Sequence, residues 1–453
     1  MNSAHYIFFF LLAIGILIVV HELGHYAAAR LCGVKVLRFS LGFGPQILMR
    51  RVGSDQTEWS LAAVPLGGYV KMLDEREGSV NVGERHRAFN TQSLGRRSFI
   101  VAAGPLANLL LAILIYWGMA CAGTRDFPAV LGPVASGSSA AQAGLVEGDR
   151  VTRFAGVEIR GWSDLKWLVV QHALDAERVK LEVQREGIGL ASFDLAMQGV
   201  LIDEKAPDAL KQLGVSLPAI LTVPVLGRPL ADSPADLAGF AEGDRVRKVD
   251  GFELGSAAEF VKIIAASPGR TLSVQVERAG KLLTLEVRPE SVADKPLQGR
   301  IGIPVGMDRD AVAKSIITVR YGVLEGGVHA VSQTFSTAGF YLQAIWHIVK
   351  GNISWRNVSG PIAIADAAGQ SAKAGVDAYL GLIAALSVSL GVLNLLPIPI
   401  LDGGHLLYYA IERIRGRALS EGAEELSQRI GLVMLVLLMS LAFFNDFHRV
   451  FFG

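Results

Sequence analysis

Cysteine is nearly absent from this chain: only Cys32 and Cys121 occur among 453 residues. So few thiols exclude a disulfide framework and a zinc site built from cysteine thiolates. An excess of charge is missing as well, because 43 basic residues balance 42 acidic ones to a net charge of +1. This balance removes the electrostatic basis for binding nucleic acid, and no nucleic-acid partner is expected.

Hydrophobic residues, in contrast, are abundant. They make up 51% of the chain, and the mean hydropathy is +0.39, which predicts membrane-spanning segments. Four apolar stretches are expected to cross a lipid bilayer as helices: residues 1–30, 98–122, 377–402 and 430–447. The last is short for a hydrocarbon core that needs about 20 residues. The first could be a signal peptide, but no basic residue precedes its apolar run, as such a peptide requires.

Lysine and arginine predict the orientation of these helices. The loops at residues 31–97 and 403–429 are rich in both, whereas the N-terminal tail has neither. Both loops are therefore expected to face the cytoplasm, and both termini the periplasm. The long insert between the second and third spans is then extracytoplasmic.

A repeat lies within that insert. Ser138–Val151 reads SSAAQAGLVEGDRV and Ser233–Val246 reads SPADLAGFAEGDRV, so 9 of 14 aligned positions match. Alternating apolar stretches follow each copy, which predicts two β-rich domains at 126–217 and 218–308. The signature AGL-x-x-GD-x-V resembles bacterial PDZ domains, which bind an extended peptide beside a strand. Taken alone, its Gly and Asp residues are also typical of ordinary turns.

The first span ends in the motif HELGH, from His21 to His25. On a helix, residues four apart share a face, so both imidazoles can reach one zinc ion. Glu22 lies beside them, where it can take a proton from a water molecule. Ionisable groups in a membrane helix are costly and usually functional, although histidines at the membrane interface are the alternative.

A catalytic zinc needs a third protein ligand and an open position. The third span ends in NLLPIPILDGG, residues 394–404, and it crosses in the same direction as the first. Asp402 therefore lies at the depth of HELGH and is the expected third ligand. His405 is an alternative ligand, and a helix cap is the alternative role for Asp402.

A substrate helix must unwind before it is cut, and its freed backbone groups need partners. The stretch Trp59–Met72 predicts a hairpin or loop that could supply an edge strand. Whether it enters the membrane beside the zinc or forms an ordinary cytoplasmic hairpin stays open. Gly67, Gly68 and Asn394 are the expected substrate-binding residues, whereas Asn108 is expected to bond neighbouring helices.

HExxH in the first span and NxxPxPxLDGG in a late span together resemble the site-2 proteases, intramembrane zinc metalloproteases of the M50 type. The runs Leu66–Glu75, Gly104–Asn108 and Asn357–Ile364 and the two PDZ-like units extend the resemblance to almost the whole chain. The resemblance implies one Zn²⁺ per chain, held by His21, His25 and Asp402, with Glu22 as the catalytic residue. It also implies a bacterial inner-membrane protein that cleaves a single-pass anti-sigma factor already clipped on its outer side. The PDZ-like units would act as a size filter, and the active site would lie toward the cytoplasm.

The sequence thus predicts a polytopic α-helical membrane protein with four transmembrane helices and two extracytoplasmic PDZ-like β-rich domains. The expected parts are 1–30, 31–97, 98–122, 126–217, 218–308, 309–376 (amphipathic helices and a connector), 377–402, 403–429 and 430–447. The predicted function is zinc endopeptidase acting on transmembrane segments. A non-catalytic PDZ membrane scaffold and a zinc transporter are the competing hypotheses.

Overall fold

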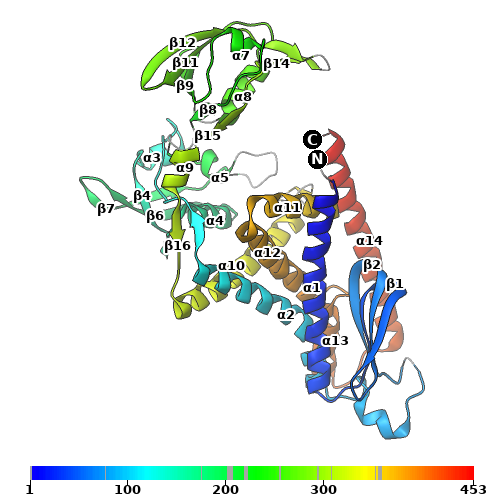
Figure 1. Cartoon of the computed structure of the whole chain (residues 1–453). Helices are drawn as coiled ribbons and strands as arrows, with labels where there is room; N and C mark the ends of the chain where they lie inside the picture. The colour runs from blue at the N-terminus through cyan, green and yellow to red at the C-terminus, as the bar shows by residue number, and fades with distance from the viewer. Residues whose placement is uncertain are drawn as a thin grey trace. The chain divides into compact units, whose positions relative to one another are not determined.

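The chain folds into two compact units, which are described separately (Figure 1). One comprises Met1–Thr124 and Arg320–Gly453, and the other comprises Arg125–Val319. This computed structural model describes residues 3–76, 78–174, 176–200, 208–218, 223–254, 257–292, 295–307, 309–351, 354–355 and 360–452. Of the motif run 357–364, residues 357–359 lie outside the described residues.

Four helices of the first unit are long and apolar enough to cross a membrane. They are α1 (Ser3–Leu31), α2 (Leu94–Ala122), α12 (Val376–Leu395) and α14 (Glu421–Phe452). Runs of apolar residues on all sides of a helix, rather than on one stripe, are typical of segments surrounded by hydrocarbon. Figure 1 shows the N- and C-terminal marks at the same end of this unit, as expected when the chain crosses a membrane an even number of times.

Two of these helices differ most from their predicted bounds. α12 ends at Leu395 rather than near residue 402, because Pro397 and Pro399 lack the amide hydrogen that a continuing helix needs. α14 begins at Glu421, nine residues before the predicted start, because the polar run EGAEELSQR consists largely of good helix formers. At 32 residues, α14 is long enough to span a bilayer without local thinning.

Shorter helices complete the first unit. They are α10 (Val323–Val349), α11 (Pro361–Ala374), α13 (Asp402–Arg415) and the 3-10 helix η1 (Val82–Arg87). α2 packs against α1, α10, α12 and α13. It is therefore the central helix of the unit.

The first turn of α11 is bonded to a side chain of α14. The Asp446 carboxylate, 2% exposed, accepts hydrogen bonds from the backbone amides of Gly360 (3.1 Å), Ile362 (2.7 Å) and Ala363 (3.2 Å). These amides have no partner within their own helix, and an anion near them also interacts favourably with the helix dipole. Asp446, which lies 86 residues after Gly360 in the sequence, thus caps the start of α11.

The segment after α1 forms a two-stranded sheet of β1 (Val36–Val52) and β2 (Thr57–Met72). Both strands are long and irregular, so Phe39 of β1 pairs with Trp59 and also with Val70 of β2. The Phe39 and Trp59 rings stack with centroids 4.4 Å apart. The predicted hairpin or loop at 59–72 is thus the second strand of this sheet.

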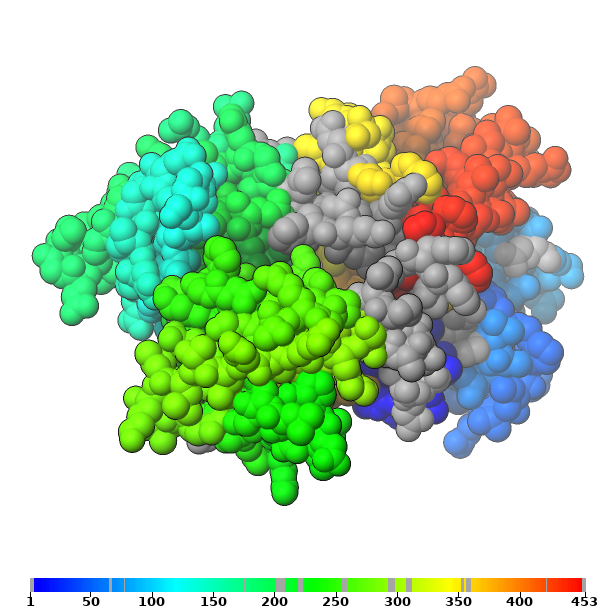
Figure 2. Space-filling view, turned by 90° about the horizontal axis from the view of Figure 1, so that it is seen from above, coloured from blue at the N-terminus to red at the C-terminus, as the bar shows by residue number. Residues whose placement is uncertain are grey.

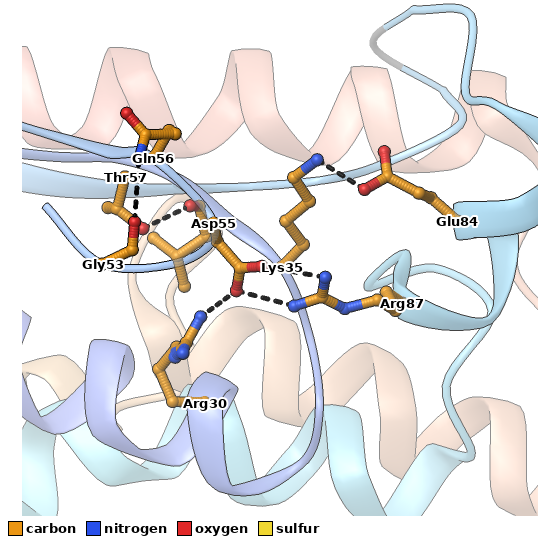
Figure 3. Close-up of polar contacts among 9 residues, drawn as sticks. Arg30, Lys35, Gly53, Asp55, Gln56, Thr57, Glu84 and Arg87 are labelled. Atoms are coloured by element: carbon orange, nitrogen blue, oxygen red, sulfur yellow. Dashed lines mark hydrogen bonds and ion pairs between the residues drawn. The ribbon is translucent and has the colours of Figure 1, made fainter. Parts of the chain in front are cut away.

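Ion pairs tie the turn of this sheet to the end of α1 (Figure 3). The Asp55 carboxylate accepts hydrogen bonds from Arg30, in the last turn of α1, and from Arg87 of η1, the latter at 2.6 Å. Lys35 pairs with Glu84 at 2.6 Å. The hydrogen bonds from Arg87, working against the effect of burial, hold the pKa of Asp55 below its usual range.

The second unit contains two copies of one arrangement of elements, coloured cyan to blue-green and green to yellow-green in Figure 2. The first copy consists of α3 (Ser139–Gln142), β4 (Arg150–Phe154), β5 (Val157–Glu158), α4 (Trp162–His172), β6 (Arg178–Arg185), β7 (Gly189–Ala196) and α5 (Ala209–Gln212). The second consists of β8 (Pro224–Leu226), α7 (Pro234–Leu237), β9 (Arg245–Val249), β10 (Phe252–Glu253), α8 (Ala257–Ala265), β11 (Leu272–Arg278), β12 (Lys281–Val287), β13 (Glu290–Val292), β14 (Lys295–Arg300) and β15 (Val305–Met307). Their sheets have the strand orders β5-β4-β6-β7 and β12-β11-β9-β8-β15, with β10 on β9. Each copy has its own apolar core.

The aspartate of the repeated GD motif has the same role in both copies. Asp149 and Asp244 have fully buried side chains, and each accepts two hydrogen bonds at 2.7 Å from an arginine, Arg185 or Arg278. Burial opposes ionisation of Asp244, but the hydrogen bonds from Arg278 and from the Ala241 amide hold its pKa below the usual range. The motif therefore closes a turn through an ion pair in which the carboxylate is buried.

The stretch predicted as amphipathic helices and a connector contains α9 (Arg309–Ser315), β16 (Ile317–Val319) and α10. β16, at the end of the second unit in the sequence, pairs with β3 (Thr124–Asp126), at its beginning. α10 buries a row of small residues, Gly326, Ala330, Thr334 and Thr337, and leaves larger apolar side chains exposed on its other face.

Candidate metal centre

The two histidines of HELGH lie one turn apart on α1, and their rings face the same point. Their Nε2 atoms are 3.2 Å apart, and their ring planes meet at 85°. The helix produces this arrangement directly, since positions four apart share a face. His21 and His25 are both largely buried, with side chains 12% and 11% exposed.

Asp402 completes a triangle with these two nitrogens. Its Oδ2 atom lies 3.2 Å from His21 Nε2 and 3.5 Å from His25 Nε2. Asp402 is the first residue of α13, and the irregular stretch before it contains Ile400 with a positive φ of 84°. The carboxylate therefore reaches the histidines from the start of α13, just after the irregular stretch that follows the third span.

The donor set and its spacing fit a zinc ion. Zinc is bound by imidazole nitrogen and carboxylate oxygen at about 2.0–2.2 Å, which at tetrahedral angles puts ligand atoms about 3.3 Å apart. The three edges of the triangle, 3.2, 3.2 and 3.5 Å, agree with that spacing. Three ligands would leave one tetrahedral position open, as in catalytic rather than structural zinc sites.

His405, the alternative ligand, does not join this group. Among the described residues, the donor atoms that lie within 4.8 Å of one another belong to His21, His25 and Asp402. The His405 ring lies against Tyr408 instead, edge to face, with centroids 5.9 Å apart.

Neighbouring backbone holds the ring of His25. Its Nδ1 atom lies 2.9 Å from the carbonyl oxygen of Ile100, on α2. Gly104, one turn further along α2, lies directly under the ring, and a Cβ atom there would be 2.6 Å from Cε1 of His25. Gly24 of the motif lies equally close to α2, because a Cβ atom added to it would be 2.8 Å from the Cβ atom of Ala107. The two helices thus cross so closely at this point that glycine is required on both.

Glu22 is 8% exposed and lies next to the predicted glycines of β2. A Cβ atom on Gly68 would lie 2.9 Å from Glu22 Cγ and 3.0 Å from Ile18 Cγ2. Gly67, with φ of 119°, makes the adjoining bend. Asn394 is half-buried in the last turn of α12, and within the described part of the chain its side chain has no hydrogen bond.

Neither Ile100 nor Gly104 was predicted to have a role at the site. The Ile100 contact uses a backbone carbonyl, which any residue carries, so no residue type could reveal it. Gly104 begins the run GPLAN, which was used only as a mark of resemblance. A glycine in an apolar span, on the helix that follows the metal motif, is the signal that indicates a close helix crossing.

Known proteins resemble this chain over almost its whole length. The Peptidase family M50 model matches residues 9–438. Regulator of sigma-E protease RseP of Escherichia coli (strain K12) is 39% identical over 445 residues, 97% of this chain and 98% of that protein. RseP of Salmonella typhimurium (strain 14028s) is 37% identical over 452 residues, 97% of this chain and 98% of that protein.

Among solved structures, the PDZ domain of an SdrC-like protein from Listeria monocytogenes aligns with 18% of this chain and 87% of that chain. The identity is 24% and the TM-score is 0.17, too low to support a conclusion about the fold. The family model and the full-length relatives, in contrast, confirm the resemblance to site-2 proteases and disfavour a non-catalytic scaffold or a transporter. The chain therefore belongs to peptidase family M50 and is an intramembrane zinc metalloprotease.

Proposed function

We propose that His21, His25 and Asp402 hold one zinc ion per chain and that Glu22 is the catalytic base. The observation that carries this assignment is the triangle of two nitrogens and one oxygen with edges of 3.2 to 3.5 Å. Two helices far apart in the sequence, α1 and α13, supply these atoms.

A zinc ion, when bound, acts as a Lewis acid that activates water and polarises a carbonyl group at neutral pH. Glu22 accepts a proton from the attacking water and passes it to the nitrogen of the leaving amine. Its burial beside the ligands keeps bulk water away from this transfer. Asn394, with no hydrogen bond to other described residues, donates to the substrate carbonyl oxygen as negative charge develops there.

The end of β2 is proposed to hold the unwound substrate. Gly68 to Met72 pair with β1 on one side only, from Leu41 to Val36, so this segment is an edge of the sheet. Gly68 lies against Glu22, which puts the edge beside the catalytic residue. A substrate strand added here satisfies its freed backbone groups with the strand's N–H and C=O groups.

The name of a relative supports a proposed substrate class. RseP is named as a regulator of sigma-E, and we infer that this chain cleaves the membrane segment of a single-pass anti-sigma factor. We place it in a bacterial inner membrane with both termini periplasmic and the zinc toward the cytoplasm, because the basic residues lie in the loops 31–97 and 403–429. The two copies in Arg125–Val319 are then two extracytoplasmic PDZ-like domains that filter substrates by size.

A cleavage assay tests the proposal. Purified wild-type protein in detergent is incubated with a single-pass substrate already shortened on its periplasmic side, and zinc content is measured in parallel. We expect about one zinc per chain and cleavage within the membrane segment. Glu22→Gln is expected to keep the zinc and lose cleavage, whereas Asp402→Asn is expected to lose both.

Three results would contradict this assignment. Cleavage by Glu22→Gln would reject Glu22 as the base. Wild-type zinc binding in Asp402→Asn would reject the third ligand. Zinc uptake into sealed vesicles without any cleavage would favour a transporter instead.

A further inference from the structure

An unusual amide lies beside the candidate metal centre. Asn108 of α2 is fully buried, and its Nδ2 atom is 3.4 Å from Nδ1 of His21. Its Oδ1 atom is buried and has no hydrogen-bond partner among the described residues. Buried side-chain amides are normally satisfied, so an amide aimed at a ligand histidine needs a physical reason.

The chemistry of a metal-bound imidazole supplies that reason. His21 faces Asp402 and His25 through Nε2, so Nδ1 is the ring nitrogen that does not point at the metal position. When Nε2 of a neutral imidazole donates its lone pair to a metal, Nδ1 carries the proton and must donate it. The group opposite should therefore be an acceptor, which Asn108 provides when its amide is turned by 180°. The nitrogen and oxygen of an amide exchange places in that turn at little steric cost.

His25 already shows the same pattern. Its Nδ1 atom lies 2.9 Å from the carbonyl oxygen of Ile100, which can only accept. Ile100 and Asn108 are eight residues apart on α2, about two helical turns, so they lie near one face of that helix. One helix thus offers an oxygen to each of the two histidines.

We propose that Asn108 is a positioning residue that orients His21 for zinc by accepting the hydrogen bond from its Nδ1 atom. Partners of this kind fix the tautomer and the ring orientation of a ligand histidine, and their loss typically weakens metal binding by about 10–100-fold. The inference rests on the ligands assigned above, and it adds a role for a residue of α2.

Asn108 is well placed for this role because its own backbone is held. Its carbonyl oxygen accepts a hydrogen bond from the Ser387 hydroxyl of α12 at 2.7 Å, and Ser387 is fully buried. Ser387 therefore offers a matched control, since its removal weakens the same helix contact without touching the amide.

The test measures zinc affinity by competition with a chelator, together with the visible absorption spectrum of the cobalt-substituted protein. Asn108→Leu, which is close in volume and cannot accept a hydrogen bond, is expected to bind zinc about 10–100-fold more weakly and to shift the cobalt bands. Asn108→Asp, which retains an acceptor, is expected to restore both, and Ser387→Ala is expected to leave both close to wild type.

Wild-type affinity and spectrum in Asn108→Leu would overturn the inference while leaving the ligand assignment intact. An equal loss in Ser387→Ala, or no recovery in Asn108→Asp, would also overturn it, because either result indicates helix packing as the cause. Failure of the wild-type protein to bind zinc would overturn the ligand assignment and this inference together.

Discussion

At the scale of single residues, the centre depends on atoms that carry no catalytic chemistry. His25 packs on Gly104, and its Nδ1 atom bonds the backbone of Ile100. Glu22 packs against Gly68 in the same way. Each of these neighbours fixes where a functional side chain lies, so enlarging either glycine should affect zinc binding or cleavage.

Gly104→Ala tests this dependence at His25. The added methyl group would overlap the imidazole ring, so the ring must move away from the triangle. We expect zinc affinity to fall about 10–100-fold, as for other supporting residues of metal ligands, when it is measured by chelator competition. Gly118→Ala on the same helix is the control, because its Cβ atom would meet nothing within 4 Å. Unchanged affinity in Gly104→Ala would contradict the described helix crossing.

At the scale of elements, polar contacts add to the apolar packing that joins the helices and the sheet. Asp446 of α14 caps α11, and Asp55 in the β1–β2 turn bonds the end of α1 and η1. Both contacts lie where apolar packing is sparse, because α14 and the distal part of β1 expose many apolar side chains. Such contacts fix the position of an element that lipid or solvent otherwise surrounds.

Asp446→Ala should loosen the start of α11. Three backbone amides would lose their acceptor, and a lost helix cap costs about 0.5–2 kcal/mol. We expect a lower melting temperature and faster hydrogen exchange at Gly360 to Ile364. Glu425→Gln, which breaks an exposed ion pair with Arg429 on the same helix, should change neither, since such pairs contribute little. Equal exchange in both variants would show that the cap does not hold α11.

Asp55→Asn should free the turn of the sheet. Arg30 and Arg87 would lose the negative charge between them, so hydrogen exchange of Gly53 to Thr57 should become faster at neutral pH. Arg51→Gln, which removes an exposed partner of Glu58, serves as the control. No change in this turn after Asp55→Asn would mean that backbone pairing alone positions it.

At the scale of the whole molecule, the chain combines a membrane unit with a β-rich unit whose two copies each hold a buried carboxylate paired with an arginine. The membrane unit relies on close helix crossings, whereas each β-rich copy relies on its own apolar core and on the aspartate of its GD motif.

The second copy should lose stability in acid through Asp244. Because its folded pKa lies below the unfolded value of about 3.9, its contribution is complete above that pH and is lost as the pH falls through the folded pKa. Asp244→Asn should destabilise this copy by about 2–3 kcal/mol at neutral pH. The difference in melting temperature between wild type and variant should shrink on going from about pH 6 to about pH 3.

The exposed pair of Glu253 with Lys248 in the same copy supplies the control. Glu253→Gln should leave the melting temperature near wild type at both pH values, as expected for a surface pair. A gap between wild type and Asp244→Asn that stays constant with pH would contradict the role given to the buried carboxylate.

The features that could be predicted from the sequence are those that depend on local periodicity and on topology. The spacing of His21 and His25 fixes their common face, and the direction of the spans brings Asp402 to their depth. The repeated GD motif indicated two copies because each copy folds from its own sequence. The features that were not predicted depend on contacts between distant segments. They are the Ile100 carbonyl oxygen beside Nδ1 of His25 and the cap that Asp446 gives to α11. The early start of α14 was missed for another reason, since hydropathy does not detect a polar helical extension.

The most direct test of the account is X-ray absorption spectroscopy at the zinc edge, on purified wild-type protein and on Asp402→Asn. The account predicts two imidazole nitrogens with oxygen ligands at about 2.0–2.2 Å in wild type, and a loss of zinc or of one oxygen ligand in the variant. Sulfur ligands in wild type, or the same spectrum in both proteins, would contradict it.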